Sequence, residues 1–152
     1  YDVTDGLAAA IGEQGGRLVT VSDTSLTIAS AAGEVETSYA YAGSYLREYD
    51  LGGDGFTALL LNRDKSGGVG RLVTVDTEGQ EIASLDVNRE ILSISAAGDY
   101  LAVLYMDSVV IYTEELEVYA QLEGTGSARS VLMRPDGSAL LLAADSAHLF
   151  LP

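Results

Sequence analysis

The chain has 152 residues, of which 47% are hydrophobic, so it is long and apolar enough to bury one core and is no disordered tail. Its 23 acidic and 8 basic residues give a net charge of −15. Such a surface repels phosphate backbones and anionic lipids, so we expect no nucleic-acid partner. The absence of cysteine excludes disulfides and thiolate chemistry, and no apolar run approaches the roughly 20 residues of a membrane helix.

Taken in chain order, the sequence repeats a pattern of short apolar runs separated by turn residues. The pattern is clearest between Ile91 and Leu122, where four runs (ILSIS, YLAVLYM, VVIYT and VYAQL) are bounded by Gly, Asp, Ser or Glu. Each run is too short for a stable helix and is rich in β-branched and aromatic residues, which is typical of antiparallel strands joined by tight turns. We therefore expect one small up-and-down sheet here.

The rest of the chain repeats this unit. The second strands of the expected units begin near Arg17, Phe56, Tyr100 and Ser138, about 40 residues apart, which is the spacing of four-stranded propeller blades. A turn rich in Gly or Asp precedes each of them. The sequence thus predicts an all-β fold, a β-propeller or half-propeller with four blades of four antiparallel strands.

We expect residues 1–152 to form a single propeller-type domain, with blades at about 6–42, 43–88, 89–124 and 125–152. The last unit has runs for three strands only, and residues 1–5 precede the first unit as a spare strand. We therefore expect the last blade to be completed by a strand from the N-terminus or from a partner. The segment GLAAAIGEQGG at residues 6–16 could be mistaken for a short helix, but its glycines and its place in the repeat favour a strand.

Four blades in an open arc would leave an apolar face bare at each end. Leaving several hundred Å² of apolar surface exposed at each end loses hydrophobic stabilisation of up to about 10 kcal/mol per end, at roughly 25 cal/mol per Å². A tight four-bladed ring, a missing N-terminal half or a homodimer would each cover these ends. Because the chain begins at Tyr1, we expect a longer protein whose N-terminal half completes the propeller, and a two-copy assembly when this chain is alone.

The units PDGSALLLAADSAHLFL and AAGDYLAVLYMDSVVIYTEELEVYAQL resemble the blades of the bacterial β-propeller superfamily with PQQ-like, YVTN-like and WD40-like members. More specifically, the chain looks like the C-terminal half of an uncharacterised extracytoplasmic propeller family of Gram-positive gut bacteria. The resemblance implies a blade architecture and an extracytoplasmic or cell-surface location in a bacterium. The chain has no Trp-Asp strand ends, no Trp docking motifs and no visible quinone ligands, so the resemblance implies no cofactor.

Two groups of residues are candidates for ligand contact. Tyrosines bind sugars and peptides through their faces, and four of them gather in the run TSYAYAGSYLREY: Tyr39, Tyr41, Tyr45 and Tyr49. Packing between blades is the simpler role for them. Three of the scarce basic residues stand near the starts of inner strands, where a central channel would lie: Arg47, Arg89 and Arg129. They would bind an anion or a carboxylate, unless they form salt bridges with neighbours such as Glu48 and Glu90.

The sequence offers no constellation for catalysis or for a metal. His148 is the only histidine, and no G-x-S-x-G elbow is present. Asp23, Asp107 and Asp145 are dispersed one per unit, as turn formers are, whereas calcium loops concentrate their ligands in one segment. We therefore expect no catalytic residue and no metal ligand.

The resulting functional hypothesis is a non-catalytic binding or scaffold module that engages a protein, peptide or glycan through one loop face. Two alternatives stay open. The chain could be part of an enzyme or cofactor-dependent sensor whose site needs further blades, or a structural piece of a surface complex.

Overall fold

The computed structural model describes residues 7–64 and 70–152, and this part of the chain consists of strands and turns without a helix. Fifteen strands form four separate antiparallel sheets, each built from consecutive strands. Each sheet is therefore an up-and-down meander, as the alternation of short apolar runs with turn residues predicts.

The first sheet contains β1 (Ala8–Gln14), β2 (Arg17–Ser22), β3 (Ser25–Ala29) and β4 (Val35–Ala40). The second contains β5 (Tyr45–Asp50), β6 (Phe56–Asn62), β7 (Gly70–Asp76) and β8 (Glu81–Val87). The third contains β9 (Ile91–Ala97), β10 (Tyr100–Tyr105), β11 (Ser108–Thr113) and β12 (Val118–Glu123). The fourth contains β13 (Ala128–Met133), β14 (Ala139–Ala143) and β15 (Ala147–Phe150).

The predicted repeat is confirmed at the level of strands. The second strands begin at Arg17, Phe56, Tyr100 and Ala139, at or within one residue of the expected positions. The ambiguous segment at residues 6–16 contains a strand, as expected, which runs from Ala8 to Gln14. The expected extra strand at residues 1–5 and most of the long turn after Asn62 lie outside the described residues.

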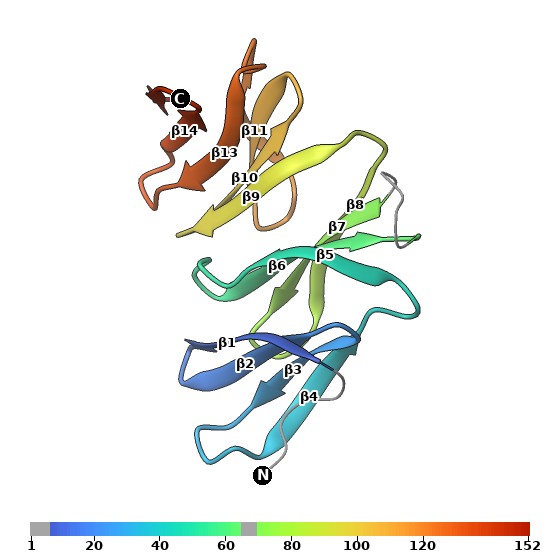
Figure 1. Cartoon of the computed structure of the whole chain (residues 1–152). Coiled ribbons are helices and arrows are strands. Elements are labelled where there is room, and N and C mark those ends of the chain that lie inside the picture. Colours follow the sequence, from blue (N-terminus) through green and yellow to red (C-terminus); the bar gives the residue numbers. More distant parts are fainter. Residues whose placement is uncertain (1–6, 65–69) are drawn as a thin grey trace.

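The four sheets follow one another through space in chain order (Figure 1). The first lies at the bottom of the view and the fourth at the top, with the second and third between them. Together they form a propeller-like arrangement of stacked meanders that does not close into a ring in the described part of the chain.

Each pair of consecutive sheets encloses a hydrophobic core. In β6, Leu59 and Leu61 pack against the first sheet, while Phe56, Ala58 and Leu60 pack against the third. Successive side chains of a strand point to opposite faces of its sheet, so a strand with a neighbour on both faces needs apolar residues at every position. This explains why the second strands read as continuous apolar runs such as FTALLL.

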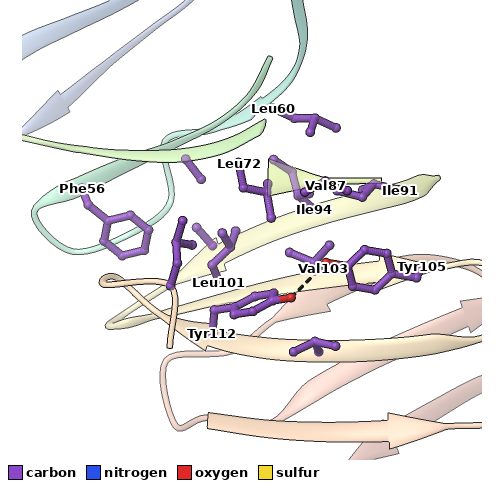
Figure 2. Close-up of a cluster of buried hydrophobic side chains, with 14 residues drawn as sticks. Phe56, Leu60, Leu72, Val87, Ile91, Ile94, Leu101, Val103, Tyr105 and Tyr112 are labelled. Atoms are coloured by element: carbon purple, nitrogen blue, oxygen red, sulfur yellow. Dashed lines mark hydrogen bonds between the residues drawn. The ribbon is translucent and has the colours of Figure 1, made fainter. Parts of the chain in front are cut away.

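The core between the second and third sheets contains a polar pair (Figure 2). Tyr105 at the end of β10 and Tyr112 on β11 are both buried, and their hydroxyl oxygens lie 2.9 Å apart. Burial is the main cause that raises the pKa of Tyr112, and the hydrogen bond to Tyr105 adds to it. Each hydroxyl is thus the partner of the other in an otherwise apolar cluster.

Side chains at the ends of the inner strands tie each sheet to the next one. Gln14 Nε2 donates to the carbonyl oxygen of Phe56 at 2.8 Å, and the amide of Ala96 donates to Asp50 Oδ2 at 3.0 Å. At the last junction, the amide of Met133 donates to Ser95 Oγ at 2.9 Å. A polar side chain therefore bonds to backbone at all three junctions, in addition to the side-chain packing between the sheets.

Tight turns with positive φ join the strands within the sheets. Gly15 and Gly16, between β1 and β2, have φ of 58° and 79°, a pair that only glycine adopts at low cost in a two-residue hairpin. Gly79, between β7 and β8, has φ of 78°, and a Cβ there would lie 2.6 Å from Cγ2 of Thr37. Gly79 thus lets the second sheet approach β4 of the first.

Candidate functional site

The four candidate tyrosines have different environments. Tyr39, on β4, is partly buried and donates a hydrogen bond to Glu81 Oε1 of the second sheet at 2.6 Å. Burial, followed by this bond to a carboxylate, raises the pKa of Tyr39 to about 12. Tyr49, on β5, donates to the carbonyl oxygen of Ala9 at 3.2 Å. Both hydroxyls thus connect the first sheet to the second.

Tyr41 and Tyr45 lie on either side of the connection from the first sheet to the second. Tyr41 is buried in the core that these two sheets share, and burial raises the pKa of its hydroxyl well above the usual value. Tyr45 is 46% exposed at the start of β5. Since Tyr41 is buried, the four rings do not form one exposed aromatic platform, and Tyr45 alone offers substantial surface to a ligand.

The three candidate arginines are also not equivalent. Arg47 donates to the carbonyl oxygen of Ile91 at 3.2 Å, and the guanidinium of Arg89 lies 3.8 Å from the centre of the Tyr105 ring. These two side chains therefore support the junction between the second and third sheets. Arg129 is exposed on β13 and makes no ion pair with a described residue. Within the part of the chain that the structure describes, neither Arg47 nor Arg89 pairs with Glu48 or Glu90.

The fourth sheet has an apolar face that is another candidate for contact with a partner. Its inner face packs on the third sheet through Val131, Met133, Ala139 and Leu141. The opposite face has no neighbouring sheet among the described residues and carries four leucines, which we call the leucine face: Leu132, Leu140, Leu142 and Leu149.

Strand register places these leucines side by side. Leu132, Leu140 and Leu149 are cross-strand partners on β13, β14 and β15, so they form one continuous row. Leu142 lies two residues beyond Leu140 and so on the same face. Leu132, Leu142 and Leu149 are 53%, 43% and 47% exposed. The leucine face is therefore a contiguous apolar patch that is partly exposed to solvent in the described part of the chain.

The edge of the fourth sheet is open as well. The other three sheets have four strands, whereas this one has three within the described residues, so β15 is its outermost strand. Its backbone N–H and C=O groups on that side have no strand partner in the described part of the chain. An open strand edge beside an apolar face provides both backbone and side-chain contacts to a partner.

The far face of the first sheet, at the other end of the arrangement, differs from the leucine face. Its central residues Thr20 and Thr27 are polar and already buried, and its exposed large apolar residues, Ile11 and Val35, lie on the two outer strands β1 and β4. The expectation of one bare apolar face at each end is therefore met at the fourth sheet only.

The fourth sheet differs from the rest of the protein in its net charge. Residues 125–152 contain two arginines, Arg129 and Arg134, and two aspartates, Asp136 and Asp145, and thus carry no net charge with histidine neutral. The whole surplus of −15 belongs to residues 1–124. The leucine face is therefore the part of the molecule that another acidic protein can approach with the least repulsion.

The described residues contain no group of three or more His, Asp or Glu side chains that could hold a metal ion. His148 lies on the exposed edge strand β15, and its Nε2 is 3.3 Å from Ser146 Oγ. In the same described residues, no helix is long and apolar enough to span a membrane.

Sequence reasoning expected a bare apolar face at each end of the arrangement but did not identify the leucines that form this one, although a signal was present. The runs VLM, ALLLA and LFL follow each other with apolar residues at every position, which predicts strands covered on both faces. Which of the two faces stays uncovered depends on the packing of the sheets and cannot be read from those runs.

No protein-family model and no curated protein matches the sequence. Among solved structures, the fold is similar to that of the computationally designed Ika4 protein, with a TM-score of 0.69 and 12% identity over 97% of this chain and 92% of that one. It is also similar to Hsv2 of Kluyveromyces lactis, with a TM-score of 0.62 and 14% identity over 96% and 49% of the two chains.

A protein of unknown function from Bacteroides caccae gives a TM-score of 0.54 and 12% identity over 96% of this chain and 56% of that one. At these identities the likeness concerns the fold alone. The chain thus spans about half the length of two similar structures and nearly the full length of the third.

Proposed function

We propose that this chain is a non-catalytic assembly module, in which each of the four sheets is a propeller blade and the leucine face binds another protein. The single observation that carries the proposal is the row of exposed leucines on the fourth sheet, next to its open edge. In the three junctions inside the molecule, the corresponding faces are covered by a further sheet. The leucine face has the chemistry of one more such junction.

The partner that these observations favour is a second copy of this chain. The leucine face is the uncharged part of an otherwise acidic molecule, so two copies meeting there keep their charged portions apart. The centre of the far face of the first sheet is formed by the buried polar residues Thr20 and Thr27, so that face is a poor complement for leucines. We therefore propose an isologous dimer, in which the leucine faces of two copies pack on each other.

An assembly of this kind contains eight sheets from two chains. The same surface would bind further blades of a longer protein, as the resemblance to a C-terminal half-propeller implies. From that resemblance we also propose that the protein works outside the cytoplasm of a bacterium. Fractionation of cells that express the complete gene product tests the location.

The oligomeric state of the protein tests the proposed interface. We expect sedimentation velocity to show a monomer–dimer equilibrium that shifts toward the dimer as salt is added, because salt screens the repulsion between two copies of charge −15. A chain that stays monomeric at all accessible concentrations and salt levels contradicts the proposal.

A matched pair of substitutions locates the interface. Leu132→Asp places a charge within the leucine face, on β13, and Val118→Asp places one on β12, where Val118 is 61% exposed but lies outside that face. Burying one leucine is worth about 1.5–3 kcal/mol, and the isologous interface loses it twice. We expect Leu132→Asp to weaken the dimer at least tenfold and Val118→Asp to leave it unchanged. The reverse pattern would assign the dimer to another surface.

A further inference from the structure

A cavity of about 280 Å³ lies between the first and second sheets, at the end of the core they share. Its lining includes Tyr41, Ser44, Leu61, Arg63, Arg71 and Asp86. The volume is at the lower end of the range for small-molecule sites, so it accommodates one small ligand. None of these residues belongs to the leucine face, so the cavity is separate from the proposed interface.

Strand register explains why charged residues gather at this point. Leu61, Arg71 and Asp86 are cross-strand partners on β6, β7 and β8, so they share one face of the second sheet. Leu61 packs in the core with Tyr41, so this face is the one that meets the first sheet. The row is thus apolar on β6 and charged on the next two strands, and Arg63 follows directly after β6.

The hydroxyl of Tyr41 is one of five buried side-chain polar atoms that lack a hydrogen-bond partner among the described residues, and Tyr41 alone of these five residues lines the cavity. Leaving a buried hydroxyl unpaired is unfavourable, and such a group in a native structure calls for an explanation. Tyr41 lines the cavity, and its raised pKa keeps the hydroxyl protonated. A ligand in the cavity that accepts a hydrogen bond would satisfy it.

The two arginines of the cavity are exceptional in this acidic protein. Four of the seven described arginines have an ion pair, a carbonyl or an aromatic ring as partner: Arg17, Arg47, Arg89 and Arg134. Arg63 and Arg71 have neither an ion pair nor a hydrogen bond within the described residues, and the third such arginine, Arg129, lies on the fourth sheet. Two unpaired cations therefore lie at one cavity in a chain of net charge −15.

From this geometry we infer that the cavity binds a small monocarboxylate with an apolar body. Two guanidinium groups and the Asp86 carboxylate give the lining a net charge of +1, which balances a monoanion better than a dianion such as phosphate. The planar fork of an arginine matches the two oxygens of a carboxylate, and the Tyr41 hydroxyl donates to the same group. Leu61 and the Tyr41 ring contact the apolar part of the ligand.

Titration calorimetry and NMR with acetate, isobutyrate and benzoate test this inference on the intact chain. We expect saturable binding of at least one of these carboxylates, with shifts of the Tyr41 and Arg71 signals. We expect no binding of isobutyramide, the neutral analogue of isobutyrate. The absence of saturable binding for all three carboxylates, or tighter binding of inorganic phosphate, overturns the inference.

Three variants assign the site. Arg71→Gln should weaken carboxylate binding at least tenfold, whereas Arg129→Gln removes an equally unpaired arginine elsewhere and should leave it unchanged. Tyr41→Phe should weaken binding without lowering the melting temperature of the ligand-free protein, because the hydroxyl has no hydrogen-bond partner among the described residues. Unchanged affinity in both Arg71→Gln and Tyr41→Phe would exclude this cavity as the site.

Discussion

The buried tyrosine pair between the second and third sheets gives a quantitative test of how neighbouring sheets are stabilised. Tyr105 and Tyr112 bond to each other through their hydroxyls at 2.9 Å, inside a cluster that is otherwise apolar (Figure 2). Replacing either residue with phenylalanine removes one hydroxyl and leaves the other buried without its partner. Replacing both removes the polar groups together and keeps both rings.

The structure sets the expected magnitudes. An orphaned buried hydroxyl costs about 1–3 kcal/mol, so each single variant should lose about that much free energy of unfolding. The double variant should lose less than either single one, because no unpaired group remains. Arg89 stacks on the Tyr105 ring at 3.8 Å, and phenylalanine retains that contact. For a chain of this size, each kcal/mol corresponds to about 2–4 °C in melting temperature.

Chemical unfolding of the wild type, the two single variants and the double variant completes the cycle. Tyr45→Phe is the matched control, since Tyr45 is exposed, and it should change stability by less than about 0.5 kcal/mol. If the double variant loses the sum of the two single losses, the hydroxyls act independently, and the reasoning from their mutual hydrogen bond is refuted.

Two further predictions concern pH and backbone. Stability should fall between about pH 10 and about pH 12, because a raised folded-state pKa means that the unfolded chain ionises first. Tyr39→Phe should reduce this fall in melting temperature at alkaline pH, and a variant that loses as much stability as the wild type contradicts the prediction. Gly79→Ala should lower the free energy of unfolding by more than the roughly 1–2 kcal/mol that positive φ costs a non-glycine residue, because the new Cβ would clash with Thr37. Gly16→Ala is the control: its φ is also positive but its Cβ would meet no neighbour, so its loss reports the cost of the backbone conformation alone. Equal losses in chemical unfolding contradict the proposed contact.

The sequence by itself determined the strands. A strand is a local pattern of apolar residues between turn formers, and its recurrence about every 40 residues predicts the meanders even without a relative for comparison. The start of β13 at Ala128 and of β10 at Tyr100 was predictable for this reason. The end of β1 was not, because Gly12 interrupts the apolar run, although Gly12 and Gln14 pair with Val19 and Arg17 of β2.

The tertiary structure alone decided which residues are available to a ligand. Arg47 and Arg89 were candidates by position, but they bond to the neighbouring sheet, while Arg63 and Arg71 come together with Tyr41 only where two sheets meet. The leucines of the fourth sheet have the same local pattern as the buried leucines of β6. Whether such a row is core or surface depends on the presence of another sheet against it, and that is a property of the stacking, which no single run of residues contains.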